Sequence, residues 1–337
     1  MPRRGLGPRR ELRDPQGDKL RNVLITDHVF PSVQLEKQVL ETAGFTLQEV
    51  KPPCKTEDDV IQRCSEADAL IVQWAPITHR VLEALPRVRG VVRYGIGVDN
   101  IDVKGANELG RMVSNVPKYC LEEVSDHALA MILCLARRIP QDHNQIVHGG
   151  WGIGPYLPLP AFSDLTLGLV GFGSIAGKVS DKAKPFRFKQ IAYDPVAPKE
   201  SFTARGVERV ELDALLGRAD IISLHCPLLP ATRHMINAES IAKMKPGVIL
   251  INTARGPLIK ETDLIAALQS GRVVGAGLDV FEKEPLPVES PLRSLPNVLL
   301  TSHAASVSVR AVEQLQTKAA EAARDILLGR RPEGLLA

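Results

Sequence analysis

The stretch that decides the fold runs from Leu167 to Ala176 and has the sequence Leu-Gly-Leu-Val-Gly-Phe-Gly-Ser-Ile-Ala. A short apolar run ends there in a Gly-x-Gly-x-x-Ala pattern, and a segment with the pattern of a helix follows. A second apolar run, Gln190 to Tyr193, ends at Asp194, an acid that can accept hydrogen bonds from an adenosine ribose. Strand, glycine-rich turn, helix, strand and acid in this order are typical of a βαβ unit that binds a dinucleotide.

Each small residue of this pattern has a physical reason. Gly171 permits the tight turn out of the strand, and Gly173 lacks a Cβ, so that the backbone can approach a pyrophosphate. Ala176 is small enough for the helix to pack closely on the strand. The first N–H groups of that helix, at Ser174 and Ile175, lie at the positive end of the helix dipole and favour phosphate.

Length and composition limit the class of protein. A chain of 337 residues favours two domains, and 44% apolar with 24% charged residues is ordinary for a soluble globular protein. The net charge is +3, yet residues 1–21 alone carry seven Arg and Lys against three acids, so the remaining chain is near neutral. We therefore predict no nucleic-acid partner, and we predict that residues 1–20, rich in Gly, Pro and Arg, form a disordered tail.

Cysteine usage and hydropathy bear on the compartment. The five cysteines are scattered and include no C-x-x-C pair, which predicts neither a disulfide framework nor a metal site. No apolar stretch approaches membrane-spanning length, so no membrane partner is predicted. We expect a reduced, cytoplasmic protein.

Strand and helix patterns alternate along both halves of the chain. Thr56 and Asp59 have the spacing of a helix N-cap and its acidic first turn, whereas the Trp-, Gly- and Pro-containing segment 137–163 is expected to form an arm or loop. The expected strands are 22–26, 45–50, 69–72, 90–93, 167–170, 190–193, 221–224, 248–252, 274–278 and 298–301. This alternation predicts an α/β protein with two doubly wound parallel-sheet domains.

Polar residues follow three strands of the second domain. An Asn-Thr-Ala-Arg-Gly segment ends at Gly256, an Asp-Val-Phe-Glu-Lys-Glu-Pro segment begins at Asp279, and Thr-Ser-His ends at His303. Ligands in open α/β sheets bind beyond the carboxyl ends of the strands. We therefore expect an arginine, an acid and a histidine to converge on one rim, beside the nicotinamide end of a dinucleotide.

Several long motifs in one order resemble a known family. The matching stretches are Arg93–Asp102, the glycine-rich fingerprint with Tyr193–Pro195, His225–Leu228, Ile251–Gly256, Leu278–Pro285 and Thr301–Ala305. By these stretches, the chain from about Asn22 onward resembles the D-isomer-specific 2-hydroxyacid dehydrogenases. Residues 116–127 look most like the branch related to the C-terminal-binding-protein corepressors.

The resemblance implies a discontinuous architecture. Residues 21–117 and 306–337 would form a flavodoxin-like substrate domain, and residues 118–305 a Rossmann domain that binds NAD. The family dimerises through the region that matches the 137–163 arm, so a homodimer is expected. Arg187 stands where a glycine is common at a helix end. If that position requires a positive φ, the arginine costs on the order of 1 kcal/mol.

The resemblance also implies catalytic roles. His303 would be the proton donor and acceptor, and Glu284 its orienting partner. Arg255 would bind the substrate carboxylate and polarise the carbonyl, with backbone N–H groups of Ile96 and Gly97 completing that site. These roles agree with the chemistry, because a positioned imidazolium can protonate the alkoxide left by hydride transfer and a guanidinium matches a planar carboxylate.

A larger set of residues is expected at the cofactor. Its members are Gly171, Gly173, Ser174, Ile175, Asp194, Cys226, Pro227, Thr232, Thr253, Asp279 and His303. Two roles stay open for Asp279, a helix cap and a cofactor contact, and we favour the contact. Trp74 is either core packing or a lid on the substrate pocket. No metal is expected.

The predicted function is hydride transfer between NAD(H) and a small D-2-hydroxyacid or 2-ketoacid. Glyoxylate, hydroxypyruvate and a phosphorylated relative such as phosphoglycerate are the substrates considered. The alternative is an NAD(H)-sensing binding protein of the corepressor type, in which turnover is incidental. Retention of all three catalytic residues favours the enzyme, although Ser302 and Ser306 depart from the family pattern and leave the substrate open.

Overall fold

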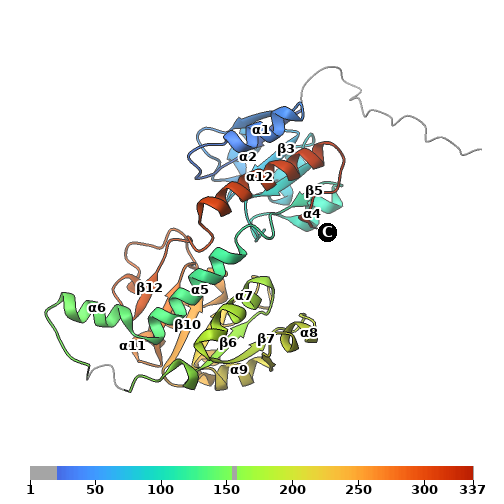
Figure 1. The fold of residues 1–337 in the computed structure, drawn as a ribbon. Coiled ribbons are helices and arrows are strands. Elements are labelled where there is room, and N and C mark those ends of the chain that lie inside the picture. Colours follow the sequence, from blue (N-terminus) through green and yellow to red (C-terminus); the bar gives the residue numbers. More distant parts are fainter. Residues whose placement is uncertain (1–20, 154–157, 337) are drawn as a thin grey trace, which may run out of the picture. The chain divides into compact units, whose positions relative to one another are not determined.

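The computed structural model describes residues 21–153 and 158–336 and divides into two compact units. The first contains the described residues up to Tyr119 together with those from Glu313 onward, and the second runs from Cys120 to Val312. Each unit is a largely parallel sheet with helices packed against it (Figure 1), which confirms the predicted α/β class. The tail predicted for residues 1–20 lies outside the described residues.

The sheet of the first unit has the strand order β13-β5-β4-β3-β1-β2. Its strands are β1 (Asn22–Ile25), β2 (Thr46–Glu49), β3 (Ala69–Val72), β4 (Gly90–Arg93), β5 (Met112–Ser114) and β13 (Leu335–Leu336). All pair in parallel except β13, which lies antiparallel to β5. The five parallel strands have the 2-1-3-4-5 order of flavodoxin-like sheets.

Three helices of the first unit, α2, α3 and α4, begin at a residue whose side chain caps the helix, whereas α1 does not. Thr56 forms a capping box with Asp59 at the start of α2, as the sequence predicts. The helices are α1 (Gln34–Thr42), α2 (Glu57–Arg63), α3 (His79–Ala84), α4 (Val103–Glu108) and most of α12 (Val309–Leu327).

The second unit is a seven-stranded parallel sheet with the order β12-β11-β10-β9-β6-β7-β8. Its strands are β6 (Thr166–Val170), β7 (Lys189–Tyr193), β8 (Glu208–Arg209), β9 (Ile221–Leu224), β10 (Val248–Asn252), β11 (Val273–Leu278) and β12 (Val298–Leu300). This is the 3-2-1-4-5-6 order of the Rossmann fold with one further strand, and the order reverses between β6 and β9. That reversal marks the crevice where dinucleotides bind.

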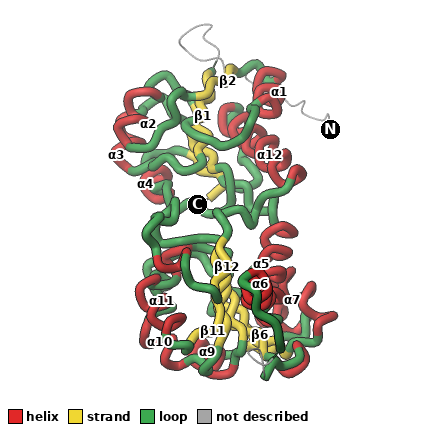
Figure 2. The backbone as a smooth tube through the Cα atoms, turned by 90° about the vertical axis from the view of Figure 1, so that its left-hand side faces the viewer, coloured by secondary structure: helices red, strands yellow, loops and turns green. Residues whose placement is uncertain are grey.

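Helices cover both faces of this second sheet (Figure 2). They are α5 (Leu121–Ala136), α6 (Ile139–Val147), α7 (Ser174–Ala183), α8 (Lys199–Thr203), α9 (Leu212–Arg218), α10 (Ala238–Lys243) and α11 (Glu261–Gln269). One apolar cluster joins the sheet to α9, α10 and α11, and another joins it to α5 and α7. Strands buried on both faces explain why β9 and β10 are fully buried runs rather than alternating patterns.

Helix α6 was not expected, because the sequence predicts an arm or loop in this segment. It begins after Arg138, whose φ is 55°, and none of its residues is buried. The apolar residues Ile139, Ile146 and Val147 recur at helical spacing, but the glycines and prolines of the segment as a whole are typical of a loop. Among the described residues, no helix combines the length and the apolar character that crossing a membrane requires.

A buried carboxylate organises the first unit. Glu36 of α1 is fully buried and accepts hydrogen bonds from the Tyr94 hydroxyl at 2.7 Å and from the Gln316 side-chain amide at 2.9 and 3.0 Å. These bonds connect α1 with the end of β4 and with α12. A buried polar group is tolerated only when it is hydrogen-bonded in this way.

We expect Glu36→Ala to lower the free energy of unfolding by about 1–3 kcal/mol, since it leaves the buried Tyr94 hydroxyl and Gln316 amide without their acceptor. Urea denaturation followed by circular dichroism measures the change. Glu41→Ala, at an exposed position of the same helix, is the control. Equal stabilities of the two variants would contradict this role of Glu36.

Candidate active site

The glycine-rich turn between β6 and α7 approaches a neighbouring loop closely. Gly171 has φ 83°, and a Cβ built on it lies 2.6 Å from the backbone nitrogen of Cys226, so only glycine fits. A Cβ on Gly173 meets nothing within 4 Å among the described residues. Space in front of Gly173 and the free N–H groups at Ser174 and Ile175 fit a pyrophosphate.

Asp194 lies at the end of β7 with most of its carboxylate already bonded. One oxygen accepts the N–H of Phe172 at 2.8 Å, and the other accepts those of Val196 and Ala197 at 2.8 and 2.9 Å. Burial alone would raise the pKa of this carboxyl, but these N–H groups and the charge of Arg209 lower it. Three of about four lone-pair positions are thus used, which leaves one for a ribose hydroxyl.

The loop after β9 faces the glycine-rich turn. Thr232 donates from its hydroxyl to the carbonyl of Pro227 at 2.7 Å and accepts the N–H of Leu229 at 2.8 Å, which holds the loop closed. Burial raises the pKa of the Cys226 thiol to about 11, so this cysteine stays protonated. Burial also lowers the pKa of His225 to about 4, which leaves that ring neutral near pH 7.

Arg255 follows β10 on a segment fixed by its neighbours. The Asn252 side chain donates to the Arg255 carbonyl at 2.8 Å, and a Cβ on Gly256 would lie 1.8 Å from the carbonyl oxygen of Phe281. Thr253 is 9% exposed, and its hydroxyl is buried without a hydrogen-bond partner among the described residues. A buried hydroxyl left in this state fits a site that a bound cofactor completes.

Glu284 and His303 form a hydrogen-bonded pair in the segments that follow β11 and β12. The Nδ1 atom of His303 lies 2.8 Å from one carboxylate oxygen of Glu284, and the other oxygen accepts the N–H of Phe281 at 3.0 Å. Burial alone would raise the pKa of Glu284, but its bond to His303, the charges of His303 and Arg255 and the Phe281 N–H lower it. The structure therefore places Glu284 and His303 in direct contact, and Arg255 near enough for its charge to act on Glu284.

Asp279 is 1% exposed, and both of its carboxylate oxygens are used within the chain. They accept the Thr301 hydroxyl at 2.6 Å and the N–H groups of Ala304 and Ala305 at 2.8 and 3.0 Å. These bonds hold the loop that carries His303, a role that neither sequence-based interpretation of Asp279 included. Its predicted contact with the cofactor stays a prediction.

Three predicted substrate-binding residues belong to the first unit. The Trp74 indole follows β3 and is 50% exposed, which excludes core packing and leaves the lid interpretation. Ile96 and Gly97 follow the neighbouring strand β4, and the Asn115 side chain donates to the Ile96 carbonyl at 2.6 Å. The loop is thus held through its carbonyl.

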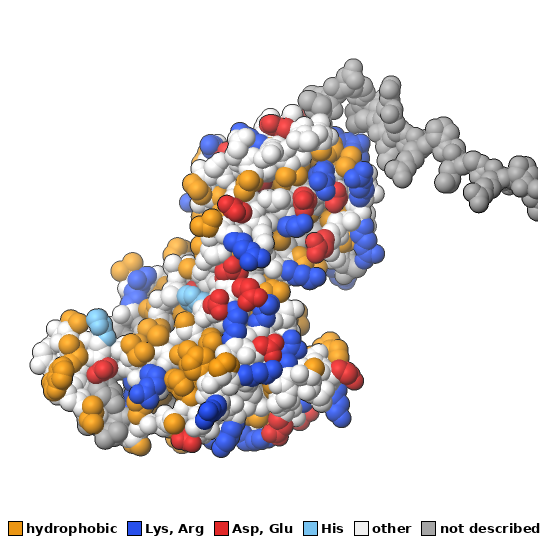
Figure 3. Space-filling view, viewed as in Figure 1, with side chains coloured by type: hydrophobic (Ala, Val, Ile, Leu, Met, Phe, Trp, Pro, Cys, Tyr) orange, Lys and Arg blue, Asp and Glu red, His pale blue; other side chains and the backbone are white. Residues whose placement is uncertain are grey.

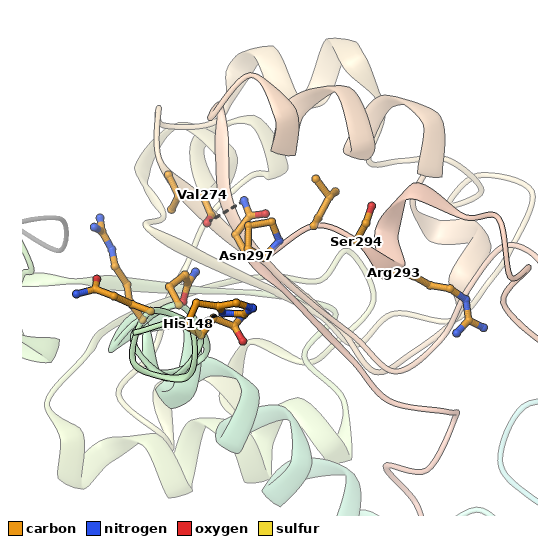
Figure 4. Close-up of a pocket in the computed structure, with 11 residues that line it drawn as sticks. His148, Val274, Arg293, Ser294 and Asn297 are labelled. Atoms are coloured by element: carbon orange, nitrogen blue, oxygen red, sulfur yellow. Dashed lines mark hydrogen bonds between the residues drawn. The ribbon is translucent and has the colours of Figure 1, made fainter. Parts of the chain in front are cut away.

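A cavity of about 820 Å³ lies elsewhere on the second unit (Figure 4). Its lining includes Val274 near the start of β11, Asn297 just before β12, and His148 after α6. It therefore lies at the amino ends of the strands, whereas the chemistry-bearing side chains follow the carboxyl ends. Among the described residues, no group of three or more His, Cys, Asp or Glu side chains is placed to hold a metal ion.

Sequence reasoning missed one cation beside the adenosine end. The sequence shows no arginine adjacent to Asp194, yet Arg209 donates to the Asp194 carbonyl at 3.1 Å. Arg209 lies on β8, which has only two residues and pairs with β7. Only the order of strands in the sheet could have revealed this neighbour.

These features define a dinucleotide-binding α/β protein with a histidine–carboxylate pair, and comparisons agree. The family model for the "D-isomer specific 2-hydroxyacid dehydrogenase, NAD binding domain" matches residues 129–305. A glyoxylate reductase of Korarchaeum cryptofilum is 40% identical over 76% of this chain and 78% of its own length. A hydroxypyruvate reductase of Thermotoga maritima is 43% identical over 73% of this chain and 80% of its own.

A solved structure is similar to this chain over most of its length. The D-lactate dehydrogenase of Aquifex aeolicus, complexed with NAD and lactic acid, superposes with a TM-score of 0.80 at 28% identity, covering 92% of this chain and 96% of its own. The chain spans about half the length of the D-3-phosphoglycerate dehydrogenases it matches. The chain belongs to the D-isomer-specific 2-hydroxyacid dehydrogenase family, a class of NAD-dependent oxidoreductases. The predicted family and cofactor are thereby confirmed.

Proposed function

We propose that this chain transfers a hydride between NAD(H) and a small D-2-hydroxyacid or 2-ketoacid, with Arg255, Glu284 and His303 as its catalytic residues. The observation that carries the proposal is the Glu284–His303 pair, placed beside the charge of Arg255 at the carboxyl edge of a Rossmann sheet. In this assignment the second unit is the NAD domain and the first is the substrate domain.

The proton step follows from which ring nitrogen is occupied. Because Nδ1 of His303 donates to Glu284, Nε2 is the nitrogen that meets the substrate oxygen. In reduction, the protonated ring donates from Nε2 to the oxygen of the ketone as the carbonyl carbon gains a hydride. In oxidation the neutral ring accepts that proton. NADH, when bound, supplies the hydride.

Substrate binding is assigned to groups of complementary charge. The Arg255 guanidinium binds the carboxylate and polarises the adjacent carbonyl, and the N–H groups of Ile96 and Gly97 complete the carboxylate site. Trp74 covers the substrate. The negative charge of Glu284 stays on the imidazole side, where it stabilises the protonated ring.

Cofactor binding is assigned to the edge around the glycine-rich turn. Gly171, Gly173, Ser174 and Ile175 accommodate the pyrophosphate, and Asp194 accepts a ribose hydroxyl. Thr253 gains a partner for its buried hydroxyl, while the loop with Cys226, Pro227 and Thr232 lines the other side. Asp279 and His303 lie toward the nicotinamide.

We also propose a cytoplasmic homodimer. Apolar side chains of α6 and the segment after it are exposed, Trp151 by 89%, and hydrophobic side chains gather at that end of the second unit in Figure 3. Exposed apolar surface of this kind is typical of an interface. All five cysteines are free thiols, as expected in a reducing compartment. Sedimentation of the purified chain and of its Trp151→Ala variant tests the dimer.

The substrate is the finer part of the proposal, and we favour glyoxylate and hydroxypyruvate. NADH oxidation, followed at 340 nm with glyoxylate, hydroxypyruvate, phosphohydroxypyruvate and pyruvate, tests it. We expect kcat of about 1–1000 s⁻¹ with at least one of these acids, as for ordinary enzymes. Tight NADH binding without turnover of any 2-ketoacid would instead favour the sensing protein.

Arg255→Lys should not behave as a conservative substitution. A fork with two parallel donors becomes a point charge, and loss of one charge-assisted hydrogen bond lowers kcat/KM for the ketoacid roughly 10- to 100-fold. The dissociation constant of NADH should change little. Arg272→Lys is the control, since Arg272 lies at the amino end of β11 and donates to backbone carbonyls at the end of α10. If kcat/KM for the ketoacid is unchanged in the Arg255 variant, Arg255 does not bind the substrate carboxylate.

Glu284→Gln should move the pH profile of reduction. The lowered pKa of Glu284 keeps its carboxylate charged wherever His303 changes protonation, so the alkaline fall in kcat/KM reports His303. Removing the negative charge destabilises the imidazolium, so this fall should move to lower pH. The rise of the oxidative rate with pH should move in the same direction.

The matched control for this profile is Glu289→Gln, at an exposed acid further along the same segment. The alkaline fall of reduction and the rise of oxidation with pH should both coincide with those of the wild type in this variant. If the Glu284 variant also coincides with the wild type, or if its reductive limb moves to higher pH, Glu284 does not act through His303.

A further inference from the structure

Three side chains form a stack that begins in the glycine-rich turn. The buried rings of Phe172 and Phe202 stack with centroids 4.6 Å apart and planes inclined by 24°. The guanidinium carbon of Arg209 lies 5.4 Å from the centroid of the Phe202 ring. Because both rings are fixed in the core, the exposed arginine at the end of the stack has a defined position.

A second contact holds the same guanidinium at Asp194. Arg209 lies beside Ala192 in the β7–β8 register, and its Nη2 atom donates to the main-chain carbonyl of Asp194 at 3.1 Å. A positive charge therefore lies next to the acid that is assigned to the adenosine ribose. A guanidinium has five N–H donors, so Arg209 can bond the Asp194 carbonyl and still donate to a further acceptor.

We propose that Arg209 is a latent site for the 2′-phosphate of NADPH, which the carboxylate of Asp194 keeps closed. The proposal rests on the cofactor site proposed above. In Rossmann domains an acid at this position selects the free ribose hydroxyl, and a nearby arginine accommodates the phosphate. This chain has both residues, the acid Asp194 and the arginine Arg209. The Asp194 carboxylate, which is assigned to the ribose, repels the 2′-phosphate.

Removal of the carboxylate opens the site. In Asp194→Ser, the dissociation constant of NADPH, measured from the change of its fluorescence on binding, should fall at least about tenfold, while that of NADH should rise. The gain for NADPH should shrink as salt is added, because a charge pair near the surface is screened. Since Asp194 also bonds three N–H groups, the isosteric Asp194→Asn is measured in parallel, with melting curves for both.

The arginine is tested in the background of the opened site. Adding Arg209→Gln to Asp194→Ser should remove the gain in NADPH affinity. Adding Arg218→Gln to Asp194→Ser should leave the gain in NADPH affinity unchanged. Arg218 pairs with Glu208, the other residue of β8, so this substitution removes the same charge nearby. This comparison separates a local contact from a change of net charge.

Two outcomes would overturn the inference. One is that neither Asp194 variant binds NADPH more tightly than the wild type does. The other is that the gain survives Arg209→Gln as well as it survives Arg218→Gln. Both differ from failure of the proposed function, which would be seen as wild-type protein that binds NADH but turns over no 2-ketoacid, or that does not bind NADH.

Discussion

The carboxylate of Asp279 determines where the imidazole of His303 lies. Its oxygens accept the Thr301 hydroxyl and the N–H groups of Ala304 and Ala305, while its own carbonyl accepts the N–H of His303 at 2.8 Å. His303 is held with φ 55°, a conformation that costs a non-glycine residue roughly 1–3 kcal/mol and persists only where surrounding bonds impose it. A buried acid at the end of β11 thus fixes the histidine that follows β12, to which we assign the proton transfer.

Similar ties connect each neighbouring pair of strand-end loops from β6 to β12. The turn at Gly171 lies against the backbone of Cys226, which joins the loops after β6 and β9. Backbone bonds from His234 to Pro257 join the next pair, and Gly256 packs on the carbonyl of Phe281. The bonds of Asp279 join the last pair of loops. The rim is therefore one continuous structure from the Gly171 turn to the loop with His303. This continuity explains why glycine is required at positions that touch no substrate.

Much of this rim could be predicted from the sequence, because parallel strands place the residues that follow them on a common edge. Arg255 and Glu284 each follow a recognisable buried strand, and His303 follows the half-buried apolar strand β12. Arg187 likewise adopts the positive φ, 65°, that a helix end there requires. The contact of Arg209 with Asp194 depends on β8, which is too short to give a pattern, and on its place beside β7. Helix α6 was missed because the glycines and prolines of segment 137–163 favour a loop, although its apolar residues have helical spacing.

The charges on the rim favour ionisation of Glu284 over that of the neighbouring Glu261. Burial raises the pKa of Glu261, and the nearby charges of Glu282 and Glu284 raise it further, against a hydrogen bond from the backbone of Glu282. Partial burial acts on Glu284 as well, but a histidine, a backbone N–H and an arginine stabilise its charged form and lower its pKa. The negative charge is therefore stabilised where it contacts Nδ1 of His303. In the proposed function, the positive charge of the neighbouring Arg255 attracts the substrate carboxylate, which leaves the substrate carbonyl to face the imidazole.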